Sequence, residues 1–209
     1  MKALKNIITG FLVSFVGSVP LGYLNIIGFE IYSKSGIYSL IPYLIGVVCV
    51  EVLVIYFTLI FAKKILENKK ILKWIEIFSI VFLLVLACTF FLKNENNSGN
   101  LLVRYIAYSP FFIGIILSSL NFIQIPFWIG WNLYLVNEKY IVLDNKLKFI
   151  YITGTLLGTF FGMLTFVLFL NFVNSNIDNN KFSISNFIPL LFLGMAFFQM
   201  FKFWKKYFR

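Results

Sequence analysis

The sequence has no histidine, two cysteines and few charged residues, and each shortage narrows what the chain can be. Only 12% of its 209 residues are charged, against about 25% in an average soluble domain, which excludes an ordinary cytosolic globule. Cys49 and Cys88 each stand alone inside an apolar run, so no metal-binding spacing and no disulfide framework is indicated. A nucleotide-binding motif is also absent from the sequence, so direct use of ATP is not expected, nor is any cofactor.

Apolar residues dominate what is present. The chain is 60% hydrophobic and 20% aromatic, with a mean hydropathy of +0.90. Runs of twenty or so apolar residues recur along its length, and each could cross a hydrocarbon core of about 30 Å as a helix. We therefore expect an all-α integral membrane protein, a single transmembrane domain over residues 1–209. Its six expected transmembrane helices cover residues 6–29, 37–62, 74–92, 110–136, 149–173 and 186–203.

The basic residues predict how these spans are oriented. All but four of the 18 Lys and Arg residues fall in the N-terminus, in the loops after the second and fourth spans, or in the tail that begins at Lys202. Because cytoplasmic loops carry an excess of Lys and Arg, both termini are expected in the cytoplasm, with the chain in the inner membrane of a bacterium. The net charge of +10 thus reflects topology, and nucleic acid is not an expected partner.

Six spans divide into halves of opposite orientation, about 1–92 and 107–209, joined by a polar linker over about 93–106. This is the layout of transporters that consist of two inverted three-helix repeats. The first and fourth spans are both interrupted by proline and polar residues. Gly46 precedes Glu51 by five residues, and Gly154 precedes Thr159 by the same distance. The sequence therefore hints at an inverted repeat with a site near the membrane midplane.

The first span is broken at GSVPLGYLN, residues 17–25. Pro20 removes a backbone donor and Gly22 allows the backbone to turn, so amides and carbonyls are freed where there is no water to satisfy them. Such a break is tolerated against protein or a wet cavity. We expect Ser18, Pro20, Gly22 and Asn25 to contribute to substrate binding. The alternative is a packing kink satisfied by local hydrogen bonds.

Glu51 lies near the middle of the second span. A charged side chain at that depth costs at least about 2.5–3.5 kcal/mol on insertion scales, so it should face the bundle interior. Since no basic residue lies at a similar depth in any expected span, we interpret Glu51 as a substrate-amine site and a proton-coupling group. The alternative is a protonated carboxyl that hydrogen-bonds a neighbouring helix.

The fourth and fifth spans carry two further sets of candidates. Asn121, Gln124 and Pro126 interrupt the fourth span and are expected to line the solute path, although Ser118 and Ser119 could simply satisfy the broken backbone. In the fifth span, Gly154, Gly158 and Gly162 form a small-xxx-small stripe, which is typical of close helix packing.

These residues resemble a known family. Residues 10–25, GFLVSFVGSVPLGYLN, are similar to the N-terminal signature of the lysine/homoserine exporter (LysE/RhtB-like) family. Gly46 with Glu51 resembles that family's second-span glycine and acid, residues 72–74 the opening of its third span, and residues 120–121 the start of its fourth-span motif. The sequence differs where Tyr23 replaces the second proline of the break.

The resemblance implies export of amino acids or related small solutes across the inner membrane, driven by the membrane gradient. The chain would be a secondary transporter rather than an enzyme, with a small-molecule substrate and the lipid bilayer as partners. Two alternatives stay open: a divalent-cation exporter on a related scaffold, and a non-transporting membrane assembly subunit. The first requires several oxygen ligands, but the expected spans hold one central carboxylate. A homo-oligomer is compatible with the sequence.

Overall fold

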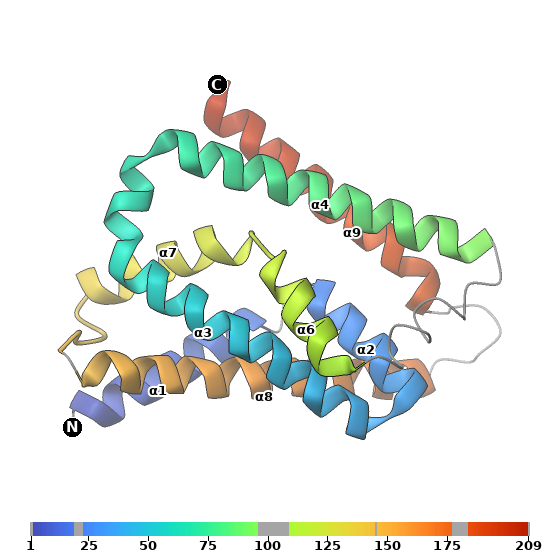
Figure 1. Cartoon of the computed structure of the whole chain (residues 1–209), viewed down its shortest axis with the longest axis horizontal. Coiled ribbons are helices and arrows are strands. Elements are labelled where there is room, and N and C mark those ends of the chain that lie inside the picture. Colours follow the sequence, from blue (N-terminus) through green and yellow to red (C-terminus); the bar gives the residue numbers. More distant parts are fainter. Residues whose placement is uncertain (1, 19–22, 96–108, 145, 177–183, 209) are drawn as a thin grey trace.

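The computed structural model describes residues 2–18, 23–95, 109–144, 146–176 and 184–208, which form helices and connecting turns without a strand. The expected all-α class is confirmed for these residues (Figure 1). The helices are α1 (Lys2–Ser18), α2 (Tyr23–Ser35), α3 (Ile37–Glu67), α4 (Lys69–Glu95), α6 (Pro110–Ser119), α7 (Gln124–Asn137), α8 (Leu147–Asn176) and α9 (Ile184–Tyr207).

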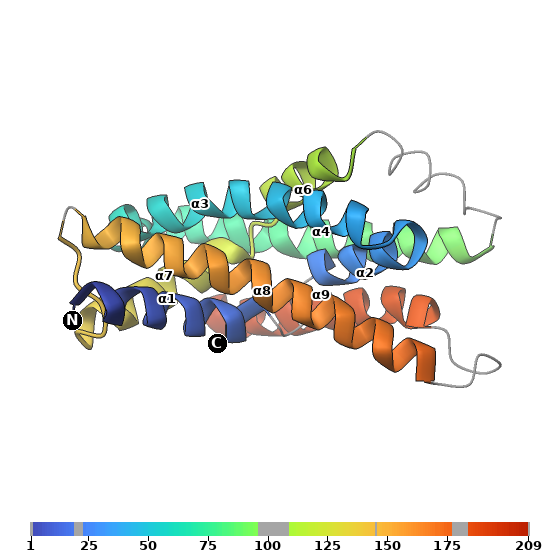
Figure 2. The ribbon, with the colours of Figure 1, turned by 90° about the horizontal axis from the view of Figure 1, so that it is seen from below.

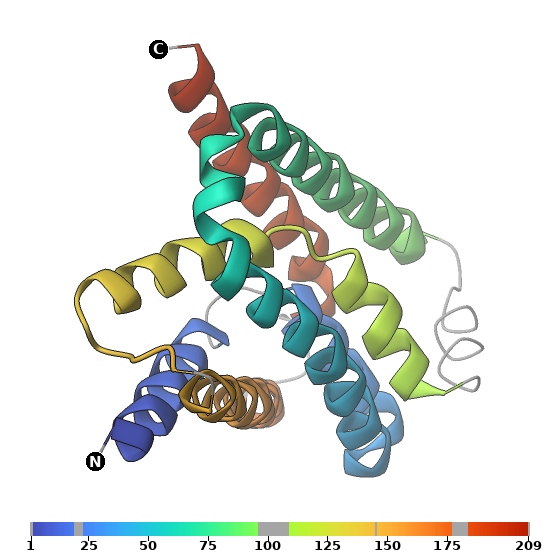
Figure 3. The ribbon, with the colours of Figure 1, turned by 60° about the vertical axis from the view of Figure 1, so that its left-hand side comes forward.

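Three helix pairs make up most of the packing. Helix α1 lies along α8, α3 packs against α6, and α4 runs beside α9 (Figures 1 and 2). Figure 3, a view nearly along α8, places α1 next to it and the α4–α9 pair on the opposite side of the molecule. Helices α3 and α7 also pack together, so α3 contacts both parts of the α6–α7 pair.

Two helices are long and apolar enough to cross a membrane, α3 over Ile37–Phe61 and α8 over Leu147–Ser175. Two bent pairs could each form one more span: α1 with α2, inclined by 76°, and α6 with α7, inclined by 71°. The described residues thus contain two to four candidate spans, which fits a membrane protein, whereas six were expected. The two remaining expected spans coincide with α4 and α9, whose side chains are described in part, and most of the expected linker lies outside the described residues.

Glycine allows α1 and α8 to approach closely. A Cβ added to Gly154 would collide with the carbonyl oxygen of Ile7, and one added to Gly10 would lie 2.6 Å from that of Tyr151. Gly158 and Gly162 face α1 in the same manner, so the small-residue stripe of the fifth expected span packs on the first. Such contacts are how small residues bring membrane helices together.

Helices α3 and α6 approach each other in a corresponding way. A Cβ on Gly46 would collide with the carbonyl oxygen of Phe111, and one on Gly114 with that of Tyr43. Tyr43 precedes Gly46 by three residues, as Tyr151 precedes Gly154. Helices α8 and α3 therefore share a Tyr-x-x-Gly pattern at these contacts, and in each pair a glycine lies against a carbonyl oxygen of the partner helix.

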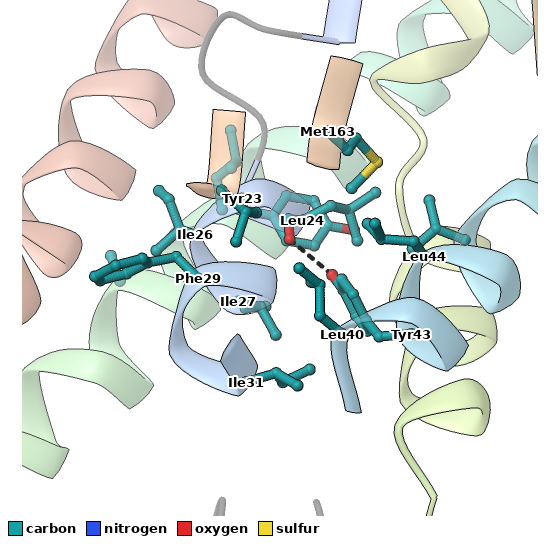
Figure 4. Packing of buried hydrophobic residues seen from close by; sticks show 14 of the residues in the cluster. Tyr23, Leu24, Ile26, Ile27, Phe29, Ile31, Leu40, Tyr43, Leu44 and Met163 are labelled. Carbon is teal, nitrogen blue, oxygen red and sulfur yellow. Dashed lines mark hydrogen bonds between the residues drawn. The ribbon is translucent and has the colours of Figure 1, made fainter. Parts of the chain in front are cut away.

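Helix α2 is buried on every side from Tyr23 to Ile31. It belongs to a cluster, here called the α2 cluster, in which its apolar side chains pack against Leu40, Tyr43 and Leu44 of α3 and against Met163 of α8 (Figure 4). The Tyr43 hydroxyl donates a hydrogen bond of 2.8 Å to the Leu24 carbonyl. The chain reverses direction after α2 at Gly36, whose φ of 72° favours glycine.

An ion pair joins α4 to the end of α9. Lys206 Nζ lies 2.6 Å from Glu76 Oε1, and the two side chains are 49% and 11% exposed. Partial burial lowers the pKa of Lys206, but the hydrogen bond to the Glu76 carboxylate and its negative charge outweigh this effect and raise the pKa above 10.5. Because the folded pKa is raised, the pair contributes stability at neutral pH that is lost as pH rises through that pKa.

Lys206→Met should therefore lower the free energy of unfolding at pH 7 by up to about 1 kcal/mol, the range of half-exposed pairs. The difference from the unsubstituted protein should narrow as pH rises from 10.5 through the raised pKa, because the folded protein loses the ammonium as the pH passes that pKa. Thermal unfolding in detergent at pH 7 and 11 measures both effects. Lys205→Met, at the exposed neighbour, is the matched control; an equal loss in the control, or a pH-independent difference, would contradict the prediction.

Candidate functional site

A cavity of about 470 Å³ lies where the two bent helix pairs meet. Its volume falls in the range of roughly 300–1,000 Å³ typical of small-molecule sites. Its walls come from α1, α2, α3, α7, α8, α9 and the turn between α6 and α7. The lining residues are Ser14, Gly17, Ser18, Tyr23, Leu24, Asn25, Val47, Glu51, Asn121, Ile123, Gln124, Phe127, Trp128, Thr159, Met163, Met195, Phe198 and Lys202.

Glu51 is the carboxylate of this cavity, and it is 8% exposed. Helix α3 carries it between the two bent pairs, and the Trp128 indole donates a hydrogen bond of 3.2 Å to its Oε1 atom. Its Oε2 atom is buried and has no hydrogen-bond partner among the described residues. Trp128 thus fixes one oxygen of the carboxyl group, and the Thr159 side chain, which also lines the cavity, interacts with the same carboxyl group.

Asn25 presents a second acceptor. It is 2% exposed, and its Nδ2 atom donates a bond of 2.6 Å to the Ser18 carbonyl, which connects the end of α1 to α2. Its Oδ1 atom is buried without a partner in the described part of the chain. A buried acceptor left unpaired costs about 1–3 kcal/mol, so both residues carry an unfavourable contribution that their surroundings must offset.

The α6–α7 break contributes Asn121 and Gln124 to the same cavity. Gln124 Nε2 donates to the Ser118 carbonyl at 3.0 Å, and Ser118 Oγ donates to the Val47 carbonyl at 3.3 Å. These bonds satisfy backbone groups at the break and attach it to α3. Ser118 and one Nε2 hydrogen of Gln124 thus satisfy backbone carbonyls at the break, which is the alternative role that the sequence suggested for Ser118.

The other expected site residues are placed differently. Pro126 does not line the cavity; it is the third residue of α7, where a missing backbone donor costs little because the first turn has no intrahelical acceptor. Pro20 and Gly22 lie outside the described residues. Ser18, Asn25, Glu51, Asn121 and Gln124 are thus the expected substrate-binding residues that the structure brings together.

Sequence reasoning missed Lys202 and the aromatic wall. Lys202 was assigned to the basic tail that indicates the topology, yet it lines the cavity together with Met195 and Phe198 of α9. The i, i+3, i+7 spacing of these three residues, which puts them on one helix face, was the available signal. For Phe127 and Trp128 the sequence held no comparable signal, because aromatic residues are common throughout the chain.

A second buried polar cluster lies away from the cavity. Tyr151 donates to Asn132 Oδ1 at 2.8 Å, and Asn132 Nδ2 donates to Thr58 Oγ1 at 3.1 Å. The side-chain polar atoms of these three residues are paired, which fits a network that stabilises the packing of α3, α7 and α8. The unpaired acceptors of Glu51 and Asn25 distinguish the cavity from this network.

Within the described part of the chain, no group of three or more acidic, cysteine or histidine side chains is placed to hold a metal ion. In comparisons with known proteins, no family model, no curated protein and no solved structure matched this chain.

Proposed function

We propose that this chain is a secondary transporter that exports amino acids or related small solutes across the bacterial inner membrane. The observation that carries the proposal is the convergence of Glu51, Asn25 and both bent helix pairs on one cavity. Broken helices that meet around a polar site are typical of secondary transporters. The cavity volume and the unpaired oxygens of Glu51 and Asn25, two of its lining residues, favour this interpretation over a packing kink alone.

We propose six spans in two inverted repeats, α1–α4 and α6–α9, with both termini in the cytoplasm. The matched glycine contacts support this topology: Gly10 of α1 approaches Tyr151 of α8 as Gly114 of α6 approaches Tyr43 of α3. An axis relating the halves would exchange the α1–α8 pair with the α3–α6 pair. It would also place Thr159 opposite Glu51, and both line the cavity.

Glu51 is the proposed proton-coupling residue. Among the lining residues it alone carries a carboxyl group, so a proton exchanged within the cavity can be held there or passed on by water. Proton uptake would remove the negative charge that holds a bound ammonium. Solute and proton would therefore compete for Glu51. Such competition is sufficient to exchange a proton for a solute molecule across the membrane.

Transport by the purified protein in liposomes tests the proposal. We expect vesicles loaded with labelled neutral amino acids to release them faster than protein-free vesicles when the outside is made acidic. Dissipating the pH difference with an uncoupler should slow this release to the rate of simple equilibration. Release that equals the protein-free rate for all twenty amino acids would overturn the proposal, because the cavity would then serve no such solute.

A further inference from the structure

We propose that Lys202 binds the anionic end of the solute, so that the cavity selects zwitterions with an apolar body over molecules with a net positive charge. The inference rests on the proposed function and deepens it by naming the substrate class. Lys202 comes from α9, whereas Glu51 and Asn25 come from α3 and α2. The cavity therefore has an acceptor pole and a donor pole on different helices.

The acceptor pole is formed by Glu51 and Asn25, which both line the cavity and each have one buried side-chain oxygen without a hydrogen bond among the described residues. An ammonium group has three donors and no acceptor, so it suits a pair of oxygen acceptors of which one is charged. An alcohol has one donor and would leave one of the two oxygens unpaired. The acceptor pole therefore fits a primary amine best.

Lys202 forms the donor pole. Its Nζ atom lies 4.6 Å from the centre of the Phe198 ring, and no carboxylate of the described residues pairs with it. Lys202 is exposed as a residue although it lines the cavity, so the cavity meets the surface beside it. A cation at the mouth of an apolar cleft attracts an incoming carboxylate and can donate hydrogen bonds to it.

Apolar side chains line much of the rest of the cavity. Met163, Met195, Phe127 and Phe198 line the cavity, and Tyr23 and Leu24 connect it to the α2 cluster. A second ammonium on the solute would face these walls or the Lys202 cation, and either position is unfavourable. An apolar side chain would instead bury its surface against methionine and aromatic side chains. Leucine therefore fits the cavity, whereas lysine does not.

Calorimetric binding to the purified protein in lipid nanodiscs tests the assignment. The probes are leucine, leucinamide, which lacks the carboxylate, and lysine. We expect leucine to bind about tenfold more tightly than leucinamide, in line with one charge-assisted hydrogen bond. Lysine should bind more weakly than leucine. This comparison of three ligands uses the unsubstituted protein, so its result does not depend on how a variant folds.

Lys202→Gln should weaken leucine binding by about tenfold and leave leucinamide binding unchanged within a factor of about two. Lys205→Gln, on the same helix and outside the cavity lining, is the matched control, and Lys202→Arg should retain leucine binding. Equal losses for leucine and leucinamide, or leucine binding in Lys202→Gln equal to that in Lys205→Gln, would overturn the role of Lys202 and leave transport intact. Absence of binding by all three probes would overturn the proposed amino-acid function as well.

Discussion

Glu51→Gln should make transport insensitive to an imposed pH gradient. Glutamine keeps an oxygen that can accept the Trp128 bond, so the local packing of α3 and α7 should persist. It cannot bind or release a proton, and it lacks the charge that favours a bound ammonium. We therefore expect gradient-driven release to fall to the rate of equilibration, and the apparent affinity for leucine to fall about tenfold through loss of a charge-assisted contact.

Glu30→Gln is the matched control for this experiment. Glu30 is buried to the same extent, 7% exposed against 8% for Glu51, but does not line the cavity and lies 3.9 Å from Lys34. Its variant should keep the response to the gradient. Exchange of labelled for unlabelled leucine, measured at saturating concentration without a gradient, separates coupling from binding. A Glu51→Gln variant that still follows the gradient would remove Glu51 from the coupling step.

Several features of the fold could be predicted from sequence because they follow from local patterns. Apolar runs of sufficient length gave α3 and α8, and the glycine spacing at Gly154, Gly158 and Gly162 indicated the face that packs on α1. The breaks in the first and fourth spans were visible as proline and polar residues. The bends of 76° and 71° were not, because an angle depends on what each half-helix packs against.

The candidate site was predictable only in part, since depth and direction depend on tertiary contacts. Glu51 and Asn25 were singled out because polar groups are costly within an apolar run, and both line the cavity. Lys202 was missed because lysine at the end of a span usually anchors to headgroups, and the pattern does not distinguish that role from facing a cavity. Pro126 was expected to line the solute path, but a proline near a break can as well lie in the first turn of the next helix, as it does in α7.

The second large effect is expected at the glycines that bring the helices together. Gly154→Ala places a methyl group against the carbonyl of Ile7, and Gly46→Ala places one against that of Phe111. Because a backbone oxygen moves only with its helix, α1 and α8 or α3 and α6 must separate. Overpacking of this kind costs about 1–3 kcal/mol, and for a chain of this length each kcal/mol lowers Tm by roughly 2–4 °C.

Gly130→Ala is the matched control, because a Cβ at Gly130 in α7 meets nothing within 4 Å. There the change should be neutral or stabilising by up to about 1 kcal/mol through helix propensity. Thermal unfolding followed by size-exclusion chromatography measures all three variants. Similar decreases in stability for Gly154→Ala and Gly46→Ala would fit two halves whose helices pack through equivalent glycine contacts. If Gly46→Ala matches Gly130→Ala, the α3–α6 contact can relax and the argument for an inverted repeat loses its geometric support.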